Sequence, residues 1–498
     1  MDIQQDHVIH LENGRFASGS SRDELNRILS RALDANPPGG LVLHFHGGLV
    51  NEASARGIAD RLAPIYADDG AYPLFFVWES GVWETIWNNL EDIRKERFFQ
   101  EVVKKVGEWV LKKLPSDIAV RGAGGGLVDE RKLRQEFDAW FSGASLELPE
   151  QVADAGTVSG GRSKGAAPRE RRLAEQIEAA LDRDFKAAVE AVYNGLHPKG
   201  SDQPATRGIG SQASAQSLIS PEAADAMFER SPVKTRGLLS WAKVAAFVAR
   251  VVIACLKRLM SGRGHGVYPT LVEEVLRAAY GDKIGAFIWS SMKTDTADAF
   301  KAGEETGGYA LLDELHKQAA RGRSFSKITL IGHSTGAIFI GHFLAAAAAR
   351  LPGQQFDVVF LAPAVTHGDF ARTLAQHRDR IAHFRMFGMR DALERKDQMV
   401  KILYPRSLLY FVTGLLEPEI DMPLVGMQRY LSETDLFNPA DFPQVAAVAQ
   451  FLDQQPDATV WSVISAAPGT SSQAEAHGDF DNDEVTVESV VHIIGSGF

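Results

Sequence analysis

Short apolar runs alternate with amphipathic stretches at both ends of the chain. An apolar run of four to eight residues is typical of a strand buried on both faces, and apolar residues three or four positions apart are typical of a helix. Helices between successive strands favour an α/β fold, with a doubly wound, mostly parallel sheet. The expected strands are residues 7–16, 41–45, 72–78, 327–331, 356–361, 381–387 and 459–464.

Residues 81–302 interrupt this alternation with a pattern that is mainly helical. Residues 283–291 are a candidate strand at the point where the chain returns to the sheet. We therefore expect residues 1–80 and 303–498 to form one α/β core, with a large helical insertion that serves as a cap, a lid or an interaction module. The glycine- and serine-rich stretches between the predicted helices are residues 122–126, 157–167 and 200–217.

The stretch KITLIGHSTGAIFIG, residues 327–341, joins a predicted strand to a predicted helix through a sharp glycine-rich turn. The turn has the pattern G-x-S-x-G, formed in order by Gly332, His333, Ser334, Thr335 and Gly336. Small residues at its outer positions let the middle serine stand on a strained bend with its hydroxyl free. The motif and its setting resemble the nucleophile elbow of the α/β-hydrolase superfamily. The resemblance implies that Ser334 is a nucleophile.

A serine nucleophile needs a histidine base, which a carboxylate orients. In the α/β-hydrolase superfamily these residues follow in the order serine, acid, histidine. Asp391 comes just after the strand expected at 381–387, and only two of the 14 histidines, His477 and His492, lie beyond it. His492 falls on an apolar helix, whereas His477 lies in a polar loop after the last strand. We expect Asp391 and His477 to complete the triad, with Glu394 and Asp397 as alternative acids.

A second motif follows the early strand at 41–45. His46-Gly47-Gly48-Leu49 resembles the HGG(G) oxyanion motif of lipases and esterases, although it lacks the third glycine. The resemblance implies that a backbone amide of this loop, from Gly48 or else Leu49, acts with the amide of Thr335 to stabilise the oxyanion of the tetrahedral intermediate.

Composition limits the remaining possibilities. The 498-residue chain has a formal net charge of -11, which does not favour nucleic-acid binding. A single cysteine, Cys255, and the lack of a secretory signal predict a cytoplasmic protein. Residues 238–260 are apolar but carry four basic residues, so we expect a bundle helix and no membrane span, with peripheral membrane contact as the alternative. No cofactor or metal is expected, because His44 and His46 are explained by the strand and the HGG loop.

Together these features predict a serine hydrolase that cleaves carboxylic esters through an acyl-enzyme intermediate, with lipid-like esters favoured. An amidase, peptidase or thioesterase would use the same triad, because the acyl chemistry is shared. The alternative from another class is a catalytically silent α/β-hydrolase scaffold whose helical insertion binds a partner. The sequence does not distinguish an oligomer from a monomer.

Overall fold

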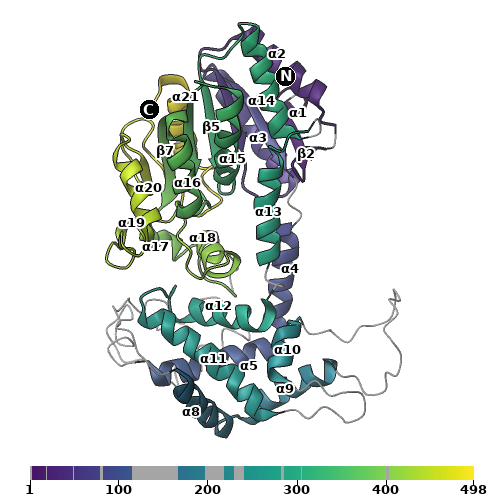
Figure 1. The fold of residues 1–498 in the computed structure, drawn as a ribbon, viewed down its shortest axis with the longest axis vertical. Helices are drawn as coiled ribbons and strands as arrows, with labels where there is room; N and C mark the ends of the chain where they lie inside the picture. The colour runs from purple at the N-terminus through teal and green to yellow at the C-terminus, as the bar shows by residue number, and fades with distance from the viewer. Residues whose placement is uncertain are drawn as a thin grey trace, which may run out of the picture.

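Strands from both ends of the chain join in one sheet, in a computed structural model of the protein (Figure 1). The structure describes residues 3–17, 19–48, 50–78, 82–114, 166–196, 218–228, 240–281, 285–303, 306–399 and 403–498. The strands are β1 (Val8–Glu12), β2 (Arg15–Phe16), β3 (Leu41–Phe45), β4 (Tyr72–Trp78), β5 (Ile328–His333), β6 (Phe356–Leu361), β7 (Ile381–Met389) and β8 (Thr459–Ser462). Their order is β2-β1-β4-β3-β5-β6-β7-β8, and only the β1–β2 pair is antiparallel. The predicted α/β class with a mostly parallel sheet is confirmed.

Helices cover both faces of the sheet. On one face α3 and α21 pack on the strands through residues such as Ile58, Leu62 and Ile493. On the other face lie α2, α14, α15, α16 and α20. The helices and helical turns of this α/β body are α1 (Ile3–Asp6), α2 (Arg22–Ala35), α3 (Glu52–Asp68), α14 (Gly307–Ala320), α15 (Gly336–Arg350), α16 (His367–His377), η2 (Arg378–Arg380), α17 (Asp391–Glu394), α18 (Leu408–Phe411), η3 (Val412–Leu416), α19 (Gln428–Ser432), α20 (Pro443–Asp453) and α21 (Glu484–Ser496).

Polar side chains fix where several of these helices begin. Ser21, Asn51 and Asp483 each precede a helix and accept a hydrogen bond from the backbone amide three residues later. Such caps satisfy amides that have no acceptor within the helix. Asp483 in this way caps the last helix, α21.

The order in which the chain adds strands to the sheet changes side between the neighbouring parallel strands β3 and β5. From β3 the chain passes through α3 to β4 on one side, and from β5 it passes through α15 to β6 on the other side. The helices that follow β3 and β5 therefore leave toward opposite faces. A crevice forms between the two loops at the carboxyl ends of such strands, and ligands bind there in open α/β sheets. In this protein those loops carry the HGG motif and Ser334.

Most of the described helices between β4 and α14 form a second, helical body (Figure 1). Because α4 is the next described element after β4, this body extends from the carboxyl edge of the sheet. Its described helices are α4 (Val82–Lys95), α5 (Arg97–Lys113), α8 (Ala166–Ala179), α9 (Arg183–Leu196), α10 (Pro221–Met227), α11 (Trp241–Met260), α12 (Val267–Tyr280) and α13 (Ala286–Asp298). The strand considered for residues 283–291 is wrong, because that segment enters α13. Residues 133–141, part of the segment expected to be mainly helical, lie outside the described residues.

Helix α11 is the centre of the helical body, as expected for residues 238–260. It packs on α5, α8, α10 and α12, and its basic residues Arg250 and Lys257 are exposed. Within the described residues, no helix combines the length and the apolar character that crossing a bilayer requires.

A buried cluster of charged residues joins the helical body to the α/β body. We call it the junction cluster; it consists of Arg258, His265, Glu273, Asp421 and Arg429. His265 lies between two carboxylates, with Nδ1 2.8 Å from Glu273 Oε1 and Nε2 3.1 Å from Asp421 Oδ1. Burial alone would raise the pKa of Glu273, but Arg258 and His265 lower that pKa to about 2. The carboxylates are therefore ionised and paired.

Candidate active site

Ser334 lies at the end of β5 in a backbone conformation that serine rarely adopts. Its φ angle is 53°, in the left-handed region that is unfavourable for residues with a Cβ. The neighbouring loop holds it there, because the Ser334 amide donates to Leu361 O at 2.8 Å and the Ala364 amide donates to Ser334 O at 3.0 Å. Strained residues of this kind cluster at functional sites.

The glycines of the motif make this turn possible. A Cβ on Gly332 would come within 2.7 Å of the carbonyl carbon of Gly336. A Cβ on Gly336 would overlap the carbonyl oxygen of Phe45 in the adjacent strand β3. The two glycines thus let the serine turn sit against the strand that leads to the HGG loop.

Gly336→Ala is expected to lower the free energy of unfolding by about 1 to 3 kcal/mol, because the overlapped atom is backbone and cannot move aside cheaply. Urea unfolding measures the change. The matched control is Gly57→Ala in the exposed middle of α3, where an added Cβ meets no atom within 4 Å. The control should be neutral or stabilising by up to about 1 kcal/mol, since alanine favours the helix. Equal effects at both positions would contradict this account of the turn.

His46 holds the HGG loop in place. Its Nδ1 donates to Gly47 O at 2.6 Å, and its Nε2 accepts from the Trp78 amide at 3.0 Å. The ring stacks on the Trp78 ring with 4.3 Å between centroids. Burial lowers the pKa of His46 to about 4, so the imidazole is neutral and can accept from Trp78. The loop is thereby tied to the end of β4.

The HGG loop lies directly against the serine. A Cβ on Gly47 would come within 3.3 Å of Ser334 Cβ. The Gly48 amide donates to the hydroxyl oxygen of Thr335, so this candidate oxyanion donor is engaged by the protein itself. The Thr335 amide is at the N-terminus of α15, where the first amides have no acceptor within the helix. Leu49, the alternative donor, lies outside the described residues.

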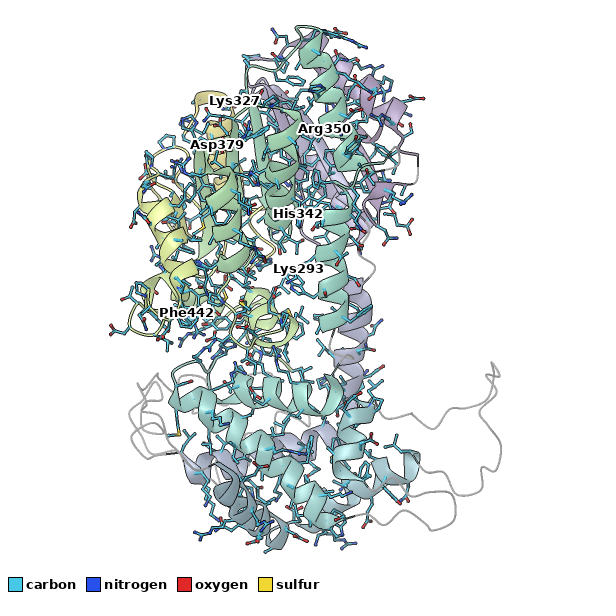
Figure 2. The ribbon with its side chains drawn as sticks, viewed as in Figure 1. Lys293, Lys327, His342, Arg350, Asp379 and Phe442 are labelled. Carbon is cyan, nitrogen blue, oxygen red and sulfur yellow. The ribbon has the colours of Figure 1, made fainter. Side chains whose placement is uncertain are left out.

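The helical body also reaches the HGG loop. Met292 of α13 is buried with its sulfur against Gly48, where a Cβ would overlap it. Helix α13 is held by Glu417, which accepts from Trp289 Nε1 at 2.7 Å and from Lys293 Nζ at 2.8 Å (Figure 2 labels Lys293). Met292 thus brings residues 81–302 into contact with the candidate site, and their role as a roof stays a prediction.

His477 lies beside the turn but is not hydrogen-bonded through its ring. Its imidazole stacks on that of His333 with 5.4 Å between centroids, and its carbonyl oxygen accepts from His333 Nε2 at 3.1 Å. Neither ring nitrogen has a hydrogen-bond partner among the described residues, so neither Ser334 nor a carboxylate is bonded to it. Burial, and to a lesser extent the nearby His333, lower the pKa of His477 to about 3. The ring is therefore neutral at physiological pH.

The acid predicted for the triad is bonded elsewhere. Asp391 Oδ1 accepts from the Tyr410 hydroxyl at 2.6 Å, and Oδ2 pairs with Arg395 Nε at 2.7 Å. Contrary to expectation, Asp391 and His477 are therefore not joined. The alternative acid Asp397 does contact His477, since its Oδ2 accepts from the His477 backbone amide at 3.0 Å. The other alternative, Glu394, is fully buried, and burial raises the pKa of its carboxyl well above the ordinary value.

His333, a residue that the sequence marked only as part of the turn, lies beside a carboxylate. Its Nδ1 lies 3.3 Å from Asp481 Oδ2, and both side chains are buried. Burial alone would lower the pKa of His333, but the Asp481 carboxylate raises it above the ordinary value. This pair could not be found from the sequence, because the residues are far apart in the chain and Asp481 looked like one of several acidic residues before a helix.

His44 is a core residue. Its ring is fully buried and stacks on Phe75 with 4.9 Å between centroids, and burial lowers its pKa to about 3. Among the described residues, no group of three or more histidine, cysteine or acidic side chains is arranged to hold a metal ion.

The buried neutral His44 predicts acid sensitivity. An unfolded histidine binds a proton below about pH 6.5, whereas folded His44 does so only near pH 3. The free energy of unfolding should therefore fall as pH drops between these values, by about 1.4 kcal/mol per pH unit from this residue. His44→Phe removes this contribution, so its slope between pH 6 and 4 should be shallower by that amount in urea unfolding. Parallel slopes for variant and wild type would refute the prediction.

No protein-family model, no curated protein and no solved structure matches this chain.

Proposed function

We propose that the protein is a serine hydrolase that cleaves carboxylic esters, with Ser334 as the nucleophile. The observation that carries the proposal is the left-handed backbone of Ser334 at the carboxyl end of β5. This position lies beside the point where the strand order changes side. Two glycines without room for a Cβ, and an HGG loop packed against the serine, support the same assignment. This combination is what the resemblance to the nucleophile elbow implies.

In this proposal Ser334 Oγ attacks the ester carbonyl carbon while its proton passes to His477. The tetrahedral oxyanion accepts from the Thr335 amide and from an amide of the HGG loop. Collapse breaks the bond to the alcohol, which leaves with the proton from His477. Water then attacks the acyl-enzyme, giving its proton to His477, and the acid is released with Ser334 restored.

Two rearrangements convert the resting structure into this arrangement. The His477 ring turns from its stack on His333 so that one nitrogen reaches Ser334 Oγ. The Gly48 amide leaves the Thr335 hydroxyl for the oxyanion. Asp397, already bonded to the His477 backbone, is the carboxylate best placed to orient the turned ring, in preference to Asp391.

A fluorophosphonate probe tests the proposal directly. Attack of Ser334 on phosphorus with loss of fluoride gives a stable adduct, so wild type should be labelled at Ser334 and Ser334→Ala should not. Failure of the wild type to react would refute the assignment. Parallel assays with esters, thioesters and amides of one acyl group separate the proposed esterase from the amidase, peptidase or thioesterase alternative.

A second candidate function is a catalytically silent scaffold whose helical body binds a partner. The observation that favours it is the resting arrangement, in which the His477 nitrogens are unpaired among the described residues and Asp391 is bound to Tyr410 and Arg395. The scaffold predicts no labelling of Ser334 in the full-length wild type. The cytoplasmic location and the peripheral membrane contact stay predictions from the sequence.

A further inference from the structure

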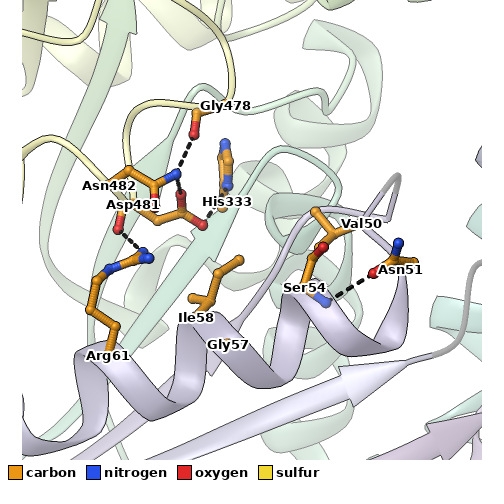
Figure 3. Close-up of a pocket in the computed structure, with 10 residues that line it drawn as sticks. All are labelled: Val50, Asn51, Ser54, Gly57, Ile58, Arg61, His333, Gly478, Asp481 and Asn482. Atoms are coloured by element: carbon orange, nitrogen blue, oxygen red, sulfur yellow. Dashed lines mark hydrogen bonds and ion pairs between the residues drawn. The ribbon is translucent and has the colours of Figure 1, made fainter.

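A cavity of about 490 Å³ opens beside the candidate active site (Figure 3). Its wall is formed by the start of α3, by His333 and by the loop from Gly478 to Asn482. Each segment continues from a part of the candidate site: His333 precedes Ser334, Gly478 follows His477, and α3 follows the HGG loop. Ser334 is not itself a lining residue, but a Cβ on Gly47 would lie 3.3 Å from Ser334 Cβ and 3.8 Å from Cγ2 of Val50, which lines the cavity. The HGG loop thus connects the cavity to the serine.

The Asp481 carboxylate at the buried end of the cavity faces groups of the protein itself. Figure 3 shows Asp481 and His333 facing each other. Asp481 Oδ1 also accepts from Asn482 Nδ2 at 3.1 Å. The carboxylate raises the pKa of His333 above the ordinary value. The one acidic side chain among the lining residues is thus directed to His333 and Asn482.

Arg61 adds a positive charge to the wall. Its Nη2 donates to the backbone oxygen of Asp481 at 2.5 Å, which is a neutral acceptor (Figure 3). The guanidinium has five N–H donors in a planar fork, so further donors remain for a ligand. The neutral polar side chains of Asn51 and Ser54 line the same cavity, and only Val50 and Ile58 are apolar.

We propose that this cavity binds an anionic group, a carboxylate or a phosphate, carried by the ester that Ser334 cleaves. The inference rests on the proposed function and narrows its substrate class. The arginine fork matches the two oxygens of such an anion. The proposal differs from the expectation from the sequence that lipid-like esters are favoured.

Binding to Ser334→Ala protein tests the inference apart from catalysis. Mono-4-nitrophenyl succinate and 4-nitrophenyl pentanoate have acyl chains of similar size, but only the first ends in a carboxylate. Isothermal titration calorimetry should give a Kd at least about tenfold lower for the succinate ester, as expected for one hydrogen bond to a charged group. Adding Arg61→Gln should bring the two Kd values together. Arg61 is exposed, so this change should leave the fold intact.

Two changes at Gly57 provide a steric control. Its position faces open space, so Gly57→Phe should fill the cavity and weaken binding of the succinate ester, whereas Gly57→Ala should leave the Kd unchanged. Equal Kd values for the two esters, or a preference that survives Arg61→Gln, would overturn the inference. Absence of fluorophosphonate labelling together with Arg61-dependent succinate binding would overturn the proposed function and support the cavity.

Discussion

Ser334→Ala is expected to lower kcat for ester hydrolysis by about 10⁴- to 10⁶-fold, the loss typical of removing a triad nucleophile. Alanine removes the oxygen that forms the acyl-enzyme and leaves the turn otherwise intact. The Ser334 backbone is held by hydrogen bonds with Leu361 and Ala364, which the substitution does not touch. Steady-state kinetics on a 4-nitrophenyl ester, with circular dichroism to check folding, measure the effect.

Ser462→Ala is the matched control for this experiment. Ser462 is also a fully buried serine at the carboxyl end of a parallel strand, and its hydroxyl has no hydrogen-bond partner among the described residues. It lacks the left-handed backbone and the glycine-flanked turn of Ser334, so kcat should stay within about twofold of wild type. Similar losses for both variants would mean that Ser334 acts through folding, and a residual rate in Ser334→Ala near wild type would exclude it as the nucleophile.

Asp421→Asn is expected to lower the free energy of unfolding by about 3 to 5 kcal/mol, because removing one charge of a buried ion pair leaves its partners uncompensated. Asp421 is fully buried, and Oδ1 lies 3.1 Å from His265 Nε2 and 3.7 Å from Arg429 Nη2. Burial alone would raise the pKa of Asp421, but Arg429 and His265 lower it well below the ordinary value, so the carboxylate is charged. Asparagine keeps the shape and loses that charge.

Urea unfolding of the full chain measures this loss, and Asp379→Asn supplies the control. Asp379, labelled in Figure 2, lies 3.5 Å from Arg380 Nε with 74% of its side chain exposed. Surface pairs of this kind contribute at most about 1 kcal/mol, so the control should change the free energy of unfolding little. A loss at Asp421 no larger than at Asp379 would show that the junction cluster does not stabilise the attachment of the helical body.

The main elements of the α/β body could be predicted because their signals are local. The apolar runs at residues 41–45 and 356–361 each form a strand with those bounds, since a run buried on both faces cannot be left in a loop. The turn at Ser334 and the HGG loop could also be predicted, because positions with no room for a Cβ require glycine and the glycines are visible in the sequence. Both loops meet in the structure, where β3 pairs with β5.

Helix α13 shows where local signals were insufficient. Residues 283–291 contain the run AFIWSS, which suits a strand by composition. A strand needs a neighbour for its backbone hydrogen bonds, whereas a helix satisfies them within itself. In the structure Trp289 bonds Glu417, which follows η3, and Met292 contacts the HGG loop. A helix can present both side chains to these partners.

The sequence by itself determined which serine stands at the turn and which loop faces it, because strands, helix caps and glycine positions depend on neighbours in the chain. Only the tertiary structure decided the partners of the charged side chains. Asp391 lies where a triad acid was expected, yet it bonds Tyr410 and Arg395, while Asp397 meets His477 and Asp481 meets His333. The partner of each carboxylate depends on how loops that are distant in sequence are placed relative to one another. A shift of a few ångströms between two loops is enough to make or break such a contact. No pattern along the chain encodes these partners.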